Sequence, residues 1–185
     1  MRWSAQWQTL NSEQPTKRHY ILALCWLMGV VFSGYYYSAQ RLVEFDPKEK
    51  LTHVIPEQLG KQISALLEEE VRNSKGRVVH FIDQDCRCNV YSEPHVAKVS
   101  ELASQVDFDV TMISSTDKLP DFITATPATL VLGKNNELVY LGPYAQGAFC
   151  NQATDVVGLV LENYQKGFNA QLINNQAKGC YCVRT

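Results

Sequence analysis

The sequence predicts an α/β domain with a mixed β-sheet flanked by helices, preceded by one transmembrane helix. Three observations support this prediction. Residues 20–37 carry no charge, residues 57–168 alternate between helical and β-rich patterns, and the last two β-rich runs flank a short turn. A β–helix–β crossover followed by an antiparallel pair gives a mixed sheet with helices on both faces.

The uncharged segment YILALCWLMGVVFSGYYY, residues 20–37, has the length of a membrane-spanning helix. At ~1.5 Å per residue it spans roughly 27 Å, close to the thickness of the hydrocarbon core. Tyrosines lie at both ends, as is typical of side chains at a membrane interface. Lys17 and Arg18 directly precede the segment, so the positive-inside rule predicts a cytoplasmic tail over residues 1–19 and a translocated C-terminal bulk.

Two alternatives to this signal-anchor helix fit the sequence less well. A cleaved signal peptide has a shorter apolar core and a small-residue exit, which YYYSAQ matches poorly. A buried core helix is disfavoured because the segment has no polar face. The sequence therefore predicts a single-pass inner-membrane protein of the bacterial envelope, with its C-terminal domain in the periplasm.

The rest of the chain divides into segments by composition and periodicity. Residues 38–56 are charged and contain two prolines, which predicts a linker. A turn-rich connector spans 117–127, and residues 169–185 form a cysteine-containing tail. The pattern predicts helices over 57–74, 93–106 and 151–168, and strands over 77–82, 108–114, 128–133 and 137–142, the last two as a hairpin.

Charge and cysteine content restrict the functional classes. The net charge of -2 provides no basic field for nucleic acid. No glycine-rich phosphate loop or Ser/His/Asp pattern is present. Cys25 lies in the membrane segment, and five cysteines follow it, so an oxidising compartment would leave one thiol unpaired or transiently paired. These five are Cys86, Cys88, Cys150, Cys180 and Cys182.

Three features of residues 57–168 point to one known fold family. The apolar run VVHFI leads into a cysteine-containing turn that opens a helix, and Pro94 lies eight residues after Cys86. The segment ATPATLVLG directly precedes the predicted hairpin. With these features the region resembles a thioredoxin-like domain. The resemblance implies that Cys86 is the nucleophilic cysteine, that Pro127 is a cis-proline, and that the Thr126 backbone positions the substrate chain.

The resemblance implies a thiol-disulfide oxidoreductase with a redox-active centre, acting on a protein thiol or disulfide partner without a cofactor. A cysteine at a strand-to-helix turn also faces unpaired N–H groups and the helix dipole, which stabilise its thiolate. Two positions depart from the family pattern. Cys88, which is expected to resolve the mixed disulfide formed by Cys86, stands one residue before the usual resolving cysteine, and His80 replaces a buried aspartate. His80 is either a proton relay or a satisfied core histidine.

Other roles for the cysteines stay open from the sequence. Cys86 and Cys88 can instead form structural bridges in a non-catalytic binding or assembly module. The favoured expectation for the rest is a Cys150–Cys180 or Cys150–Cys182 disulfide that pins the tail to the domain. The alternative is that a tail cysteine exchanges with Cys86 or Cys88 as an internal redox partner. A Cu(I) or Zn site is a further rival, although the Cys-x-Cys spacing departs from structural zinc motifs.

Overall fold

The computed structural model of the chain describes residues 16–67, 75–114, 119–148 and 155–184. The chain forms two compact units, residues 1–38 and 39–185. The predicted membrane segment lies within helix α1 (Lys17–Arg41), whose stretch Lys17–Gln40 is long and apolar enough to cross a membrane. None of its hydrophobic window is buried in the structure. This helix is consistent with a single-pass membrane protein.

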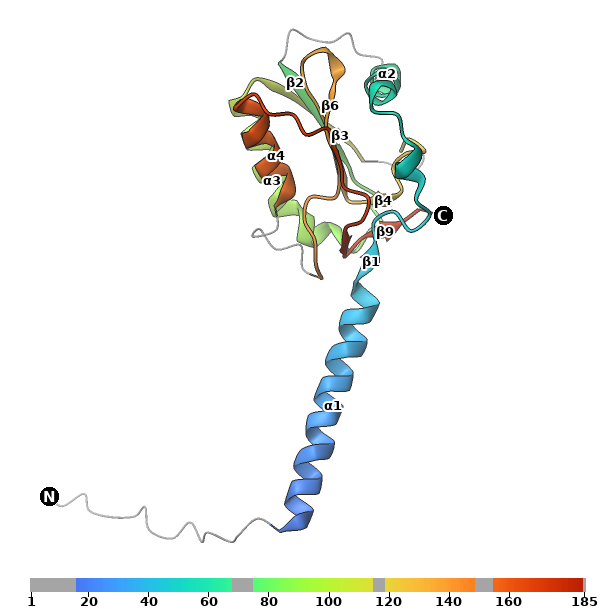
Figure 1. Cartoon of the computed structure of the whole chain (residues 1–185), viewed down its shortest axis with the longest axis vertical. Helices are drawn as coiled ribbons and strands as arrows, with labels where there is room; N and C mark the ends of the chain where they lie inside the picture. The colour runs from blue at the N-terminus through green and yellow to red at the C-terminus, as the bar shows by residue number, and fades with distance from the viewer. Residues whose placement is uncertain (1–15, 68–74, 115–118, 149–154, 185) are drawn as a thin grey trace, which may run out of the picture. The chain divides into compact units, whose positions relative to one another are not determined.

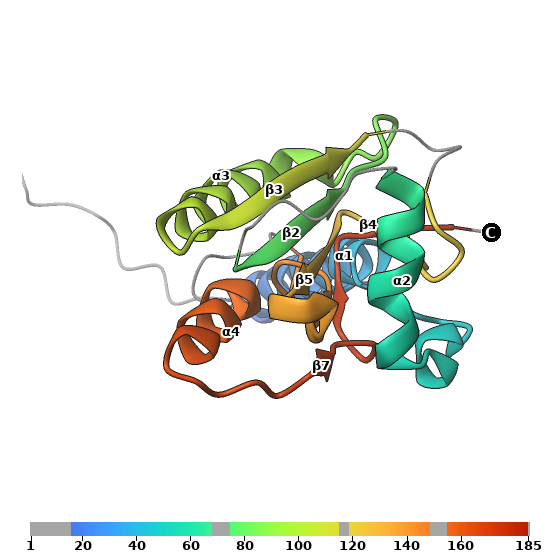
Figure 2. The same ribbon diagram turned by 90° about the horizontal axis from the view of Figure 1, so that it is seen from above.

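The second unit contains a five-stranded mixed sheet in the order β3-β2-β5-β6-β7 (Figure 2). Strand β2 pairs in parallel with β3 and antiparallel with β5, while β6 pairs antiparallel with β5 and in parallel with β7. The predicted mixed sheet and its hairpin are therefore confirmed. The strands are β2 (Gly76–Phe81), β3 (Phe108–Ile113), β5 (Ala128–Leu132), β6 (Leu138–Gly142) and β7 (Leu172–Ile173).

Helices cover both faces of this sheet, because the side chains of its central strands alternate between two cores. Val78 of β2 packs in a cluster with residues of α3 and α4, whereas its neighbour Val79 packs in a second cluster with residues of α2. Figure 2 shows α3 and α4 on one side of the strands and α2 on the other. The helices are α2 (Pro56–Leu67), α3 (Asn89–Gln105) and α4 (Val156–Gln165).

The stretch predicted to be a linker, residues 38–56, is partly built into the folded domain. It contains strand β1 (Val43–Glu44) and the 3-10 helix η1 (Lys50–His53). Phe45 and Leu51 are buried in the core. The Asp46 carboxylate accepts hydrogen bonds from the backbone N–H groups of Lys50 at 3.1 Å and Leu51 at 2.7 Å. Buried apolar side chains and the hydrogen bonds to the Asp46 carboxylate thus help to hold in the domain a segment whose charge pattern predicts a linker.

The predicted C-terminal tail, residues 169–185, is also part of the domain. It supplies β7 at the edge of the main sheet, β8 (Lys178–Gly179), which pairs antiparallel with β1, and β9 (Cys182–Val183). Strand β9 pairs antiparallel with β4 (Ala125–Thr126), and Figure 1 shows these two strands side by side. The tail therefore completes the fold and carries two cysteines to the end of the predicted connector.

Candidate functional site: two adjacent disulfides

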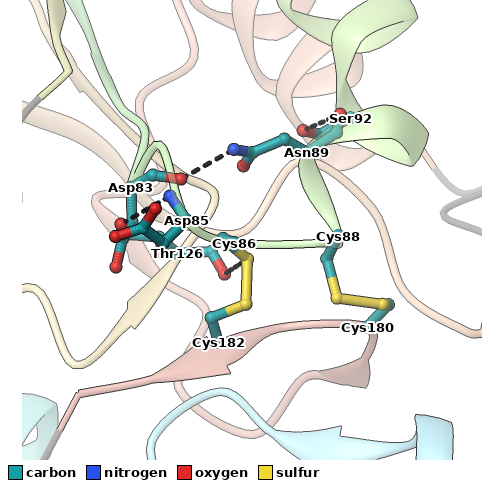
Figure 3. Close-up of a disulfide and its surroundings, with 9 residues drawn as sticks. All are labelled: Asp83, Asp85, Cys86, Cys88, Asn89, Ser92, Thr126, Cys180 and Cys182. Atoms are coloured by element: carbon teal, nitrogen blue, oxygen red, sulfur yellow. Dashed lines mark hydrogen bonds between the residues drawn. A yellow bond between two sulfur atoms is a disulfide. The ribbon is translucent and has the colours of Figure 1, made fainter.

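Cys86 and Cys88 lie in the turn that leads from β2 into α3. The backbone N–H of Cys86 donates to the Asp83 carbonyl at 3.0 Å, and the N–H of Asn89 donates to the Cys86 carbonyl at 3.2 Å. The Asn89 side-chain amide donates to the same Asp83 carbonyl at 2.7 Å (Figure 3). These bonds fix the turn from both ends, with Cys88 immediately before the first residue of α3. The strand-to-helix placement predicted for the two cysteines is confirmed.

Each of these cysteines is bonded to a cysteine of the tail. Cys86 pairs with Cys182 at a Cα–Cα distance of 5.8 Å, and Cys88 pairs with Cys180 at 5.6 Å. Figure 3 shows the two disulfides side by side, bridging the turn and the tail. Cys182 is partly exposed, whereas the other three cysteines are buried. The arrangement is a ladder of two rungs between two Cys-x-Cys segments.

The expected Cys150–Cys180 and Cys150–Cys182 disulfides are wrong, because both tail cysteines are bonded to the turn after β2. Cys150 itself lies outside the described residues. Loop-closure entropy favours any bridge that ties the tail and does not select its partner. The equal spacing of the two Cys-x-Cys pairs is the sequence feature that could have indicated this pairing. Two segments with the same cysteine spacing can form two adjacent disulfides.

The structure brings Thr126 and Pro127 to the same site. The Thr126–Pro127 peptide bond is cis, which confirms that prediction. Thr126 lies directly opposite Cys182 in the β4–β9 pair. The Sγ atom of Cys86 lies 3.6 Å from the Thr126 carbonyl oxygen (Figure 3). The first cysteine of the turn, the residue before the cis-proline and a tail cysteine therefore meet in one place.

His80 of β2 is fully buried and satisfied at both ring nitrogens. Its Nε2 lies 3.0 Å from the Ser100 hydroxyl, and that hydroxyl donates its own hydrogen to the Val96 carbonyl at 2.7 Å. Nε2 must then carry the hydrogen toward Ser100, which leaves Nδ1 to accept from the Tyr144 hydroxyl. Burial lowers the pKa of His80 to about 4. These contacts are those of a neutral core histidine, and the proton-relay role stays a prediction.

The buried imidazole predicts a loss of stability in mild acid. The unfolded chain binds a proton near the ordinary pKa of 6.5, whereas folded His80 stays neutral down to about 4. The free energy of unfolding should therefore fall with pH between these values, by about 2.5 kcal/mol between pH 7.5 and 4.5. Urea unfolding at both pH values should show this loss in the wild type relative to His80→Gln. An equal pH dependence in the two proteins would contradict the assignment.

Two clefts among the described residues lie away from the sulfur atoms. One, of about 490 Å³, is lined by η1, α2 and residues 120–122. The other, of about 530 Å³, is lined by residues 44–52 and 175–178. No cysteine lines either cleft. The sulfur atoms instead lie between the turn after β2 and the C-terminal tail (Figure 3).

The comparisons with known proteins add a family but no activity. Residues 56–184 match the family described as a domain of unknown function, DUF6436. No curated protein and no solved structure matches the chain. The matched range runs from the start of α2 to Arg184, so it includes both Cys-x-Cys pairs and the tail that joins them.

Proposed function

The chain belongs to the DUF6436 family, and we propose that it is a membrane-anchored thiol-disulfide exchange protein that acts on protein thiols. One observation carries this proposal. The Cys86–Cys182 disulfide lies at the turn into α3, with Cys86 beside the Thr126 carbonyl and Cys182 paired with the Thr126 backbone. A reactive cysteine beside a docked strand is the arrangement expected of a mixed disulfide with a bound chain.

The proposal includes a thioredoxin-like fold for the second unit. Its support is the order of elements: β2, the cysteine turn, α3 with Pro94 inside it, β3, a cis-proline, the β5–β6 hairpin and α4. In the family that the sequence resembles, the backbone before the cis-proline pairs with the substrate chain. Here Thr126 pairs with the protein's own Cys182. The tail thus takes the position that the proposal assigns to a partner.

The exchange step begins at Cys86, the cysteine beside the Thr126 carbonyl. A partner thiolate attacks Sγ of Cys86, a partner–Cys86 bond forms, the Cys86–Cys182 bond breaks, and Cys182, which is partly exposed, leaves as a thiolate. The second thiolate of the partner then attacks the partner sulfur of this mixed disulfide and displaces Cys86 as a thiolate near the N-terminus of α3. The partner dithiol is oxidised to a disulfide, and Cys86 and Cys182 are reduced and take up the two protons.

The resolving role expected of Cys88 needs a separate opening step. Cys88 is bonded to Cys180, so its thiol becomes available only after that second disulfide is reduced. Cys182 is already bonded to Cys86 and can reform that bond by attacking a mixed disulfide at Cys86. We therefore propose Cys182 as the first resolving group, with Cys88 as resolving group in the fully reduced protein.

Turnover separates this proposal from its main alternative. The full chain in nanodiscs should catalyse oxidation of a dithiol peptide by glutathione disulfide, with many peptides converted per protein. The alternative, a non-catalytic module held by structural disulfides, is favoured by the burial of Cys86, Cys88 and Cys180. That alternative predicts at most two peptides oxidised per protein. Stoichiometric oxidation without turnover would therefore contradict the exchange proposal.

The placement of the domain in the periplasm is also part of the proposal. Lys17 and Arg18 begin α1, which favours a cytoplasmic N-terminus. A phosphatase reporter that is active only after export should be active when fused after Thr185. The same reporter fused before α1 should be inactive and serves as the matched control. Activity of the N-terminal fusion with inactivity of the C-terminal one would reverse the orientation.

A soft-metal site is the second candidate, because the sulfur atoms are close enough to share an ion. The Sγ atoms of Cys86, Cys88 and Cys182 lie within 4.8 Å of one another. Thiolates bind Cu(I) and Zn(II) tightly, whereas disulfide sulfurs are poor ligands. On this candidate, the protein reduced under nitrogen should bind one equivalent of Zn(II), and the oxidised protein none. Equal Zn(II) uptake by the two forms, measured by atomic emission after desalting, would exclude it.

A further inference from the structure

The tail segment covering residues 181–184, here called the tail strand, is held by side-chain contacts as well as by its disulfide. Its backbone continues the β4–β9 pairing, since the N–H of Arg184 donates to the Thr124 carbonyl at 2.8 Å. Backbone pairing fixes the direction and register of a docked strand but is indifferent to sequence. The side chains on either side of Cys182 therefore decide which sequences fit this place.

The residue before the cysteine occupies a buried aromatic position. Tyr181 is 6% exposed, and its hydroxyl donates to the Ala145 carbonyl at 2.8 Å. Its ring packs edge-to-face against Phe45 with centroids 5.4 Å apart. A buried carbonyl acceptor at the end of an apolar space favours a tyrosine, because another apolar side chain would leave that acceptor unpaired.

The residue two positions after the cysteine occupies a site for a guanidinium group. Nη1 of Arg184 donates to the Pro120 carbonyl at 2.9 Å and to the Ile123 carbonyl at 3.0 Å. Both carbonyls belong to the connector that leads to Thr126, so this contact ties cation recognition to the same backbone that pairs with Cys182. Val183 lies between Cys182 and Arg184 in the sequence. It is 37% exposed, so this position can accept many different side chains.

We propose that the surface under the tail strand is a binding site for an extended segment of a partner protein with the sequence tyrosine, cysteine, any residue, arginine. In the structure described here, the protein's own tail strand occupies this binding site. The inference rests on the proposed function for its covalent step, but the docking contacts do not involve sulfur. The partner cysteine would lie opposite Thr126, next to Cys86, as Cys182 does.

A partner can reach the site only after the tail strand leaves it. Two disulfides hold the strand next to the site, and as part of the same chain it competes at high effective concentration. Opening both bonds takes four electrons and four protons, which two dithiol molecules supply as they are oxidised to disulfides. Reduction followed by displacement of the tail strand therefore precedes binding of the partner.

The test uses the full chain in nanodiscs with serine at Cys25, Cys88, Cys150, Cys180 and Cys182, so that Cys86 is the single thiol. A second form also carries Tyr181→Ala and Arg184→Ala, which weaken the competing tail strand. The probe is the peptide Gly-Ser-Tyr-Cys-Val-Arg-Thr, activated as its mixed disulfide with thionitrobenzoate. Attack by the Cys86 thiolate forms the Cys86–peptide disulfide and releases one thionitrobenzoate ion, which is followed by its absorbance.

The matched peptide should react about tenfold faster than a peptide with the same residues in reverse order, because only the matched one places its tyrosine and arginine correctly. The form with the intact tail strand should react more slowly than the weakened form. Near-UV circular dichroism shows whether each form is folded. If neither is, the peptides are compared on a form that keeps the Cys88–Cys180 disulfide and has serine only at Cys25, Cys150 and Cys182, so that Cys86 is still its one free thiol. Equal rates for the two peptides would overturn the proposal.

A docking measurement without sulfur chemistry separates this inference from the proposed function. A fluorescent form of the matched peptide, with serine in place of its cysteine, should bind to the form with the weakened tail strand about tenfold more tightly than the reversed peptide does. Binding is measured by fluorescence anisotropy. Such binding together with absent turnover in the glutathione assay would support the docking site and contradict only the exchange activity. Equal binding of the two serine peptides would overturn the docking site whatever the turnover.

Discussion

Removing both disulfides is expected to destabilise the domain by roughly 7 kcal/mol, whereas removing either one alone is expected to cost about 2 kcal/mol. The two bonds join residues separated by 96 and 92 positions. The first bond to form closes a loop of that size, which contributes about 4.7 kcal/mol in the chain-entropy model. The second then closes only the small ring through the two Cys-x-Cys segments, so the two contributions depend on the order of removal.

This prediction is tested with a cycle of paired alanine substitutions. The variants are Cys86→Ala with Cys182→Ala, Cys88→Ala with Cys180→Ala, and all four together. All three tryptophans, Trp3, Trp7 and Trp26, precede the domain, so urea unfolding should be followed by the near-UV circular dichroism of the tyrosines.

A natural domain is stable by about 5 to 15 kcal/mol, so a loss of roughly 7 kcal/mol in the fourfold variant should remove about half of that stability or more. Cys150→Ala is the matched control and should leave the midpoint unchanged if Cys150 contributes no bond. If the losses of the two paired variants add up to that of the fourfold variant, the two rungs constrain the chain independently, and the entropy argument fails.

Cys86→Ala is expected to reduce the rate of disulfide exchange with a protein thiol by roughly a thousandfold, to the background of the remaining thiols. Cys86 is the cysteine beside the Thr126 carbonyl, and its departure as a thiolate is assisted by the start of α3. Cys88→Ala should retain exchange within about tenfold, because Cys182 can resolve the mixed disulfide in its place. To measure the rates, samples are stopped at successive times by alkylating their free thiols. Mass spectrometry then gives the fraction of protein in each redox state.

The Cys182→Ala variant provides the sharpest comparison. It lacks the proposed first resolving group, so a mixed disulfide between Cys86 and the partner should accumulate and be seen by mass. If Cys88→Ala accumulates the mixed disulfide instead, Cys88 is the resolving group, as the sequence first indicated. Exchange at the wild-type rate in Cys86→Ala would exclude Cys86 as the reactive cysteine.

Four of the five strands of the main sheet could be predicted from the sequence because each has five or six residues and is rich in apolar side chains. The run from Val78 to Ile82 and the hairpin at Lys134–Asn136 show strong local patterns, and the observed elements differ from the predicted ones by few residues. The membrane helix was predictable for the same reason, since α1 is apolar and uncharged over 18 residues. Elements whose own residues carry the signal were found.

The tail could not be predicted in this way. Its strands β7, β8 and β9 are two residues long each, which is too short for any periodicity. Their positions depend on partners far away in the sequence, such as Val43 for Gly179 and Thr126 for Cys182. The sequence therefore indicated the cysteine-containing turn and the cis-proline but not the strand that lies next to them.

The ladder of two disulfides gives the domain three oxidation states: fully oxidised, half reduced and fully reduced. In the first two states the tail remains covalently attached to the turn, because one remaining bond holds both Cys-x-Cys segments together. Only the fully reduced state frees it. The fraction of protein with a free tail should therefore rise later and more steeply along a redox titration than the fraction of free thiols. The tail is released only when both disulfides have been reduced.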